Sequence, residues 1–131
     1  MSISFRAGET FLYPLNLASR EHLWVIVTEP NAEGQFVVVN LNSLRGAKDQ
    51  TVILFAREHD FVRHDTCVNY ARAQLTDNAT LQSWLDRGAA KMHRPLRPGV
   101  LKLIQDGSTA SDVTSKRIVD FIRAYRTRHP L

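Results

Sequence analysis

The stretch HLWVIVTEPNAEGQFVVVNLN, from His22 to Asn42, decides the fold. Two runs rich in valine, His22–Thr28 and Phe36–Asn42, flank a polar segment that contains Asn31 and Gly34. β-Branched residues favour strands, and Asn and Gly favour turns. The pattern therefore predicts a β-hairpin with a loop longer than two residues.

The sequence around this hairpin predicts further strands. Each is a short apolar run between polar segments, and the runs are Phe11–Leu15, Thr51–Phe55 and Thr66–Ala73. Short strands in series, joined by short loops, indicate an antiparallel sheet or a small barrel.

After the last of these runs the apolar residues recur at helical spacing. Asp77 is predicted to cap a helix whose apolar positions Leu81, Trp84 and Leu85 fall at i, i+3 and i+4. Gly88 is predicted to end this helix.

Two more helices are predicted near the C-terminus. Pro98 lies at the first turn of one, with Gly107 as its stop, and Ser111 caps the other. The sequence therefore predicts a single α+β domain over residues 1–131, mainly β over 1–75 and mainly helical and basic over 76–131. We expect the helices to lie on one side of the sheet.

Composition bounds the class of protein. Of the 131 residues, 44% are hydrophobic and 23% are charged, as in a globular domain that folds without a disulfide or a structural metal. The one cysteine, Cys67, lies in a β-pattern, which predicts a core residue in a reducing compartment. There is no long apolar run and no signal-peptide pattern, so we expect a cytoplasmic protein without a membrane span.

Charge is divided unevenly along the chain. Residues 1–85 carry seven Lys and Arg against nine Asp and Glu, whereas residues 86–131 carry ten against four. Arg94 and Arg97, in HRPLRPG, belong to this basic part. A basic excess suits a polyanion such as nucleic acid, and it is equally typical of a solvated helical surface.

The segment EHDFVRHD, Glu58–Asp65, contains two His-Asp dipeptides in what reads as a loop. Histidine can accept and return a proton near neutral pH, so His59 and His64 are candidates for acid–base chemistry, with Asp60 and Asp65 to orient their rings. The alternative is a loop with exposed histidines. No third ligand stands at a recognisable zinc spacing, so no metal and no cofactor are predicted.

The segment NLNSLRGAK, Asn40–Lys48, follows a predicted buried strand. Ser43, Arg45 and Lys48 can hold a phosphate through a hydroxyl group and two cations. The spacing is not that of a P-loop, which argues against nucleotide hydrolysis. Ordinary loop chemistry explains the same residues.

The order of these pieces resembles the MazF/PemK-like toxins. The resemblance is carried by LWVIV with its long turn, FVVVNLNS, HDTCVNYARAQLTD and the closing helices. That family implies an SH3-like (PemK-like) small barrel followed by C-terminal helices. It also implies metal-independent cleavage of single-stranded RNA, neutralisation by an antitoxin protein, and a homodimer.

The resemblance also implies site residues. Arg20 is nearest to the catalytic arginine of the family, a residue or two early. The catalytic threonine of the family falls near Asn42 or Ser43, of which Ser43 can supply a hydroxyl group. Arg72 falls near the arginine of the corresponding strand. His59 and His64 have no counterpart in the family.

From the chemistry of RNA cleavage we expect the two histidines to act as base and acid, in undetermined order. Arg20, Arg45 or Lys48 would stabilise the developing charge, and Ser43 would place the phosphate. The nucleic-acid contacts would come from Arg45, Lys48, Arg72, Arg94 and Arg97. A non-catalytic small barrel that binds nucleic acid or a partner protein stays open as the alternative function.

Overall fold

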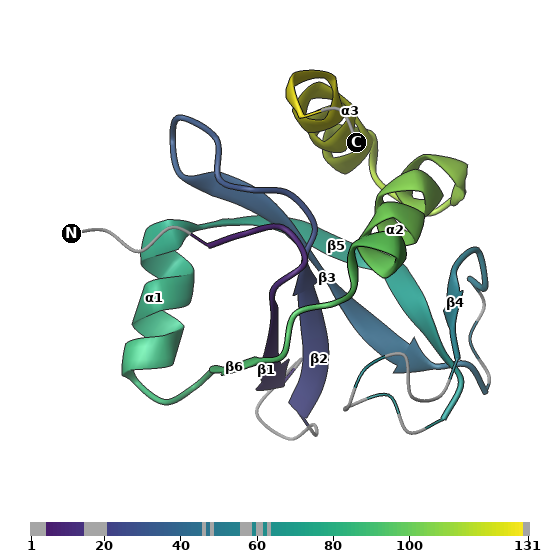
Figure 1. Cartoon of the computed structure of the whole chain (residues 1–131), viewed down its shortest axis with the longest axis horizontal. Coiled ribbons are helices and arrows are strands. Elements are labelled where there is room, and N and C mark those ends of the chain that lie inside the picture. Colours follow the sequence, from purple (N-terminus) through teal and green to yellow (C-terminus); the bar gives the residue numbers. More distant parts are fainter. Residues whose placement is uncertain are drawn as a thin grey trace.

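The computed structural model of the chain describes residues 5–14, 21–45, 47, 49–55, 59, 62 and 64–129. Over these residues the strands are β1 (Thr10–Pro14), β2 (Glu21–Ile26), β3 (Gln35–Ser43), β4 (Ile53–Leu54), β5 (Thr66–Asp77) and β6 (Lys91–His93). They form one antiparallel sheet in the order β4-β5-β3-β2-β1-β6, which curls into a half-barrel (Figure 1). The predicted α+β class, an antiparallel barrel-like sheet followed by C-terminal helices, is confirmed.

The predicted hairpin is the centre of this sheet. β2 pairs with β3 so that Trp24 lies opposite Asn40. In the connecting turn, the Asn31 carboxamide oxygen accepts hydrogen bonds from the backbone N–H groups of Glu33 and Gln35, at 3.0 and 2.9 Å. Gly34 takes a φ of 78°, a conformation that costs glycine little. The polar segment thus builds a tight turn from its own side chains.

The helices are α1 (Asn78–Asp86), α2 (Pro98–Ala110) and α3 (Lys116–Arg128). They cover both faces of the sheet, so the prediction that they share one side is wrong. Val25 belongs to the core with Ile104 of α2, whereas Trp24 and Ile26 of the same strand belong to the core with Leu81 of α1. Figure 1 shows α1 apart from α2 and α3. The run LWVIV has apolar side chains on both faces of the strand, so both faces must be buried by other elements.

The capping of α1 is confirmed. Its N-cap is Asp77, whose carboxylate accepts a hydrogen bond of 2.7 Å from the Thr80 N–H. This bond, together with the neighbouring hydrogen bonds, holds the pKa of Asp77 below its usual value. Gly88 follows the helix with a φ of 75°, as a stop residue does.

The predicted start of α2 at Pro98 is confirmed, but the predicted end of α2 and the predicted cap of α3 are wrong. Gly107 lies inside α2, which continues to Ala110. A glycine stands there because a Cβ atom at this position would overlap the side chains of Tyr70 and Val52. Ser111 does not cap α3; the cap is Ser115, whose hydroxyl accepts from the Ile118 N–H at 3.4 Å.

Three strand predictions also need correction. The expected strand Thr51–Phe55 pairs only over β4, and the expected strand Thr66–Ala73 extends to Asp77. β6 follows α1 and pairs with β1, so the chain does not run strictly from strands to helices. β6 has only the three residues Lys91–His93, of which Lys91 is exposed. Three residues are too few for an alternation of apolar and polar side chains to predict a strand.

Candidate functional site

Three of the predicted site residues lie together at one end of β3. There, Ser43 pairs with Thr66 of β5, and the Leu44 N–H donates a hydrogen bond of 3.1 Å to the Asp65 carbonyl. This pairing holds the start of β5 against the end of β3. The result is an open hollow of about 510 Å³, the serine hollow, which is lined by Ser43, Leu44, Arg45, His64 and Asp65.

The chemistry of the serine hollow is that of a phosphate site. Ser43, Arg45 and His64 are all exposed there. They supply a hydroxyl donor, a guanidinium cation and an imidazole, and together these can bind a phosphodiester and move a proton. The geometry thus brings together residues from the two segments, NLNSLRGAK and EHDFVRHD, that the sequence predicts separately.

His59 has a different environment from His64. It is 6% exposed, and its Nε2 atom lies 2.6 Å from the Arg94 carbonyl oxygen. A carbonyl only accepts, so Nε2 carries the proton and donates it to this bond. The Thr10 hydroxyl donates to the same carbonyl at 2.5 Å, and the His93 ring centroid lies 4.9 Å from that of His59. His59 thus ties its segment to the residue that follows β6, and it is not among the described residues that line the serine hollow.

The other predicted residues are spread over the molecule. Arg72 lies exposed on β5, Arg94 follows β6, and Arg97 is the N-cap residue of α2. Arg20 and Lys48 lie outside the described residues. Of the five predicted nucleic-acid contacts, Arg45 is the one described as lining the serine hollow.

An asparagine network occupies the sheet beside this hollow, and the sequence reading did not single it out. Asn40, which is fully buried, donates from Nδ2 to the Leu41 carbonyl at 3.4 Å and to the Asn42 side-chain oxygen at 3.3 Å. Its own Oδ1 accepts from Asn69 Nδ2 at 3.2 Å. His22 Nδ1 also reaches the Leu41 carbonyl, at 3.4 Å. The available signal was the spacing of Asn40 and Asn42, which alternate with apolar residues in a strand and so share one face.

Asn42 and Asn69 line a larger cavity of about 560 Å³, the amide pocket. Its described lining residues are Asn42, Ala47, Asp49, Gln50, Thr51, Cys67, Val68, Asn69, Ala71, Ala110, Asp112 and Val113. Asn42 pairs with Cys67, and Ser43 pairs with Thr66. Because consecutive strand residues point to opposite faces of a sheet, Asn42 lines the amide pocket from one face and the Ser43 side chain points from the other.

Asp49 is fixed at the edge of the amide pocket. Its oxygens accept from the Thr51 hydroxyl at 2.5 Å and from the Ser111 hydroxyl at 2.7 Å. Burial raises the pKa of this carboxyl group, but the hydrogen bonds from Thr51 and Ser111 outweigh burial and hold the pKa below its usual value. Burial, followed by the charge of Asp49, raises the pKa of the Cys67 thiol. Cys67 is therefore a protonated, buried residue, as expected for a core position.

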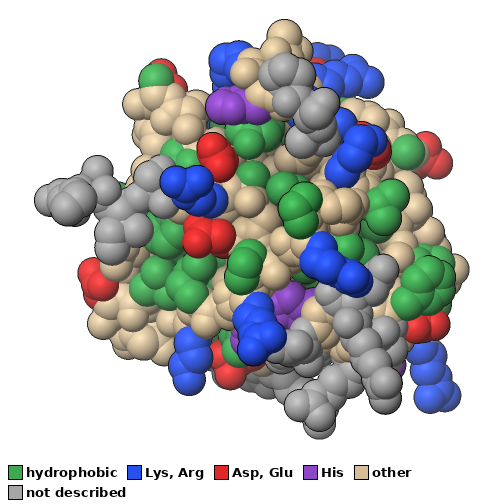
Figure 2. Space-filling model, viewed as in Figure 1, with side chains coloured by type: hydrophobic (Ala, Val, Ile, Leu, Met, Phe, Trp, Pro, Cys, Tyr) green, Lys and Arg blue, Asp and Glu red, His purple; other side chains and the backbone are tan. Residues whose placement is uncertain are grey.

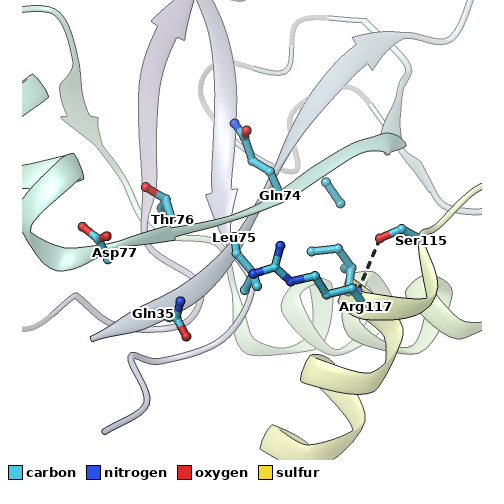
Figure 3. Close-up of a pocket in the computed structure, with 9 residues that line it drawn as sticks. Gln35, Gln74, Leu75, Thr76, Asp77, Ser115 and Arg117 are labelled. Atoms are coloured by element: carbon cyan, nitrogen blue, oxygen red, sulfur yellow. Dashed lines mark hydrogen bonds between the residues drawn. The ribbon is translucent and has the colours of Figure 1, made fainter. Parts of the chain in front are cut away.

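A third cavity of about 330 Å³ lies where α3 begins, against the ends of β3 and β5. Figure 3 shows the Arg117 side chain reaching from α3 toward Leu75, with Gln35 and Gln74 on the strands nearby. The dashed line marks the cap bond of Ser115. None of the predicted site residues that the structure describes lines this cavity.

The basic residues do not gather into one patch on the face shown in Figure 2, where Lys and Arg alternate with acidic and apolar groups. Asp106 pairs with Lys102 at 2.9 Å and also with Arg126, and Asp120 pairs with Lys116 at 2.7 Å. Part of the C-terminal basic excess is thus engaged in pairs on the helices.

The described residues lack both a cluster of metal ligands and a helix suited to a membrane. No group of three or more His, Cys, Asp or Glu among them could hold a metal ion. No helix in this part of the chain is both long and apolar enough to cross a bilayer.

No protein-family model matches the chain, and no curated protein matches it in sequence. The resemblance to the MazF/PemK-like toxins therefore rests on the sequence motifs.

Proposed function

We propose that the protein is a toxin-like endoribonuclease that binds single-stranded RNA at the serine hollow and cleaves it without a metal ion. The observation that carries this proposal is the meeting of Ser43, Arg45 and His64 in one open hollow. An antitoxin-like protein that covers this end of the sheet would block the activity.

The roles of the residues follow from the chemistry of the cleavage. His64 accepts the proton of the RNA 2′-hydroxyl, whose oxygen attacks the adjacent phosphorus. Arg45 stabilises the extra negative charge of the phosphorane, and the Ser43 hydroxyl donates to one of its oxygens. The P–O5′ bond then breaks, and water in the open hollow protonates the leaving oxygen. The products are a 2′,3′-cyclic phosphate and a 5′-hydroxyl end.

In this proposal His59 is a positioning residue rather than the second acid or base. Its Nε2 proton is already donated to a backbone carbonyl, and its side chain is almost completely buried. It secures the segment that leads into His64. This assignment revises the sequence-based expectation that both histidines exchange protons with the substrate.

The test is incubation of the purified protein with a long single-stranded RNA in EDTA. We expect discrete fragments with 2′,3′-cyclic phosphate ends. We also expect His64→Ala and Arg45→Ala each to slow cleavage by a factor of about 100 or more. His129→Ala, at an exposed histidine next to the last helix, is the matched control and should cleave as the wild type does. Cleavage that survives both His64→Ala and Arg45→Ala would refute the proposal.

A stability measurement distinguishes the roles of the two histidines. His59→Ala should lower the free energy of unfolding by about 1–3 kcal/mol, because it removes a buried hydrogen bond. His64→Ala should leave the stability nearly unchanged, because this side chain is exposed. The opposite order of effects would contradict the division of roles.

The burial of His59 also favours a second candidate function, a non-catalytic module that binds nucleic acid or a partner protein. Only one of the two histidines lines the serine hollow. RNA that stays intact but is retained in a complex weakened by salt, and weakened further by Arg45→Ala, would identify this function.

A further inference from the structure

The asparagine network fixes the orientation of three side-chain amides. The Leu41 carbonyl can only accept, so the atom of Asn40 that faces it must be Nδ2. The same Nδ2 can then face only an oxygen of Asn42, and the remaining Oδ1 of Asn40 can face only a nitrogen of Asn69. A single backbone carbonyl therefore sets the direction of all three amides.

The consequence is an ordered donor and acceptor at the amide pocket. Asn42 has its oxygen turned to Asn40 and presents Nδ2 as a donor, whereas Asn69 has its nitrogen turned to Asn40 and presents Oδ1 as an acceptor. Both residues line the amide pocket, and these two outward atoms make no other hydrogen bond to the described residues. A donor and an acceptor that line the same pocket are the groups that the hydrogen-bonding edge of a nucleobase requires.

The rest of the amide pocket suits the faces of a base. Val68, Ala71, Ala110 and Val113 give it apolar walls, and Val113 is 49% exposed although it is a large apolar side chain. Its volume of about 560 Å³ lies within the usual range for small-molecule sites.

Charge restricts which part of a nucleotide can enter. Asp49 and Asp112 line the amide pocket, and the lowered pKa of Asp49 keeps its carboxylate ionised at neutral pH. Two carboxylates repel a phosphate and the C4 carbonyl oxygen of uracil, and they attract the exocyclic amino group that adenine carries at C6 and cytosine at C4. Phosphate would instead bind at Arg45 in the serine hollow, at the end of β3.

We propose that the amide pocket binds an adenine or a cytosine of the same RNA whose backbone phosphate is held in the serine hollow. The base amino group donates to Asn69 Oδ1, and a ring acceptor receives the Asn42 N–H. This inference rests on the proposed function, because it names the base that the same site selects.

The test uses nucleosides, which carry no phosphate and therefore probe the amide pocket without the serine hollow. Adenosine, cytidine and uridine are titrated into the ¹⁵N-labelled protein, and the side-chain NH₂ signals of Asn42 and Asn69 are followed by NMR. We expect saturable shifts at these signals with adenosine or cytidine. Uridine should bind at least about tenfold more weakly.

Two variants check the location. Val113→Asp should weaken binding of the preferred nucleoside about tenfold, because it removes an apolar wall and adds charge. Leu103→Asp is the matched control, since Leu103 is 52% exposed on α2 and does not line the amide pocket. Asn42→Ala should weaken binding similarly, while Asn40 keeps its bond to the Leu41 carbonyl.

The outcomes separate this inference from the proposed function. No saturable shift at Asn42 and Asn69, uridine binding as tightly as the others, or Val113→Asp binding like Leu103→Asp would each overturn the base site, even if RNA is cleaved. Nucleoside binding at the two asparagines together with intact RNA would support the base site and remove the ribonuclease.

Discussion

The replacement Gly107→Ala tests how α2 packs on the sheet. A Cβ atom built on Gly107 would lie well under 3.0 Å from a methyl group of Val52 and from the hydroxyl oxygen of Tyr70. The Tyr70 hydroxyl donates to the Ile104 carbonyl at 2.7 Å, and both groups are buried. A single added methyl group would therefore have to displace a core side chain and a buried hydrogen bond at once.

The magnitude follows from three contributions. Alanine is better than glycine inside a helix by about 1 kcal/mol. Overpacking costs about 1–3 kcal/mol, and leaving the Tyr70 hydroxyl without its acceptor costs about 1–3 kcal/mol more. The net loss in the free energy of unfolding is about 3 kcal/mol, which is a large fraction of the stability of a small domain.

The assay is urea denaturation followed by far-UV circular dichroism. Gly99→Ala is the matched control, because Gly99 lies in the same helix and nothing stands within 4 Å of its added Cβ atom. It should be neutral or stabilising by up to about 1 kcal/mol. In a Tyr70→Phe background, Gly107→Ala should cost less, since the hydroxyl that it displaces is gone. A Gly107→Ala protein as stable as the wild type would refute this account of the packing.

Three further changes have defined outcomes. Ser115→Ala should destabilise the protein by about 1 kcal/mol through loss of the α3 cap, measured by the same urea titration, and a Ser115→Ala protein as stable as the wild type would contradict this cap. The folded-state pKa of Asp49 lies below its unfolded value, so the stability it contributes is present above the unfolded pKa and is lost as pH falls through the folded one. Asp49→Asn should therefore lower stability at neutral pH and reduce the further loss as the pH falls through the lowered pKa of this carboxyl group, measured as melting temperature against pH; an unchanged pH profile would argue against the bonds to Asp49. Trp84→Ala should cost about 2 kcal/mol, because the ring stacks on Tyr13 with centroids 4.3 Å apart, and a variant of unchanged melting temperature would show that this contact contributes little.

The site differs from its sequence-based prediction in a way that tertiary contacts explain. His59 and His64 read alike in EHDFVRHD, since each precedes an aspartate. Their difference comes from Arg94, 35 residues after His59, whose carbonyl accepts a hydrogen bond from His59 Nε2. No local pattern around either histidine reports that contact.

The asparagines are a second case in which the local sequence does not reveal a tertiary contact. The alternation in VVVNLNS places Asn40 and Asn42 on one face, but it gives no sign of the third amide. Asn69 reaches them only because β5 pairs with β3. The donor and acceptor of the amide pocket are thus a product of strand register.

By itself, the sequence determined the local structure. The valine-rich hairpin, the turn at Asn31 and Gly34, and the α1 cap at Asp77 all depend on residues that are near one another in the chain, whose propensities act without distant partners. Tertiary structure decided what depends on distant residues: the two faces that the helices cover, the glycine inside α2, the cap at Ser115 in place of Ser111, and the separation of the two histidines. Packing and long-range hydrogen bonds override local preference there, because a buried side chain must fit its neighbours and a buried polar group must find a partner.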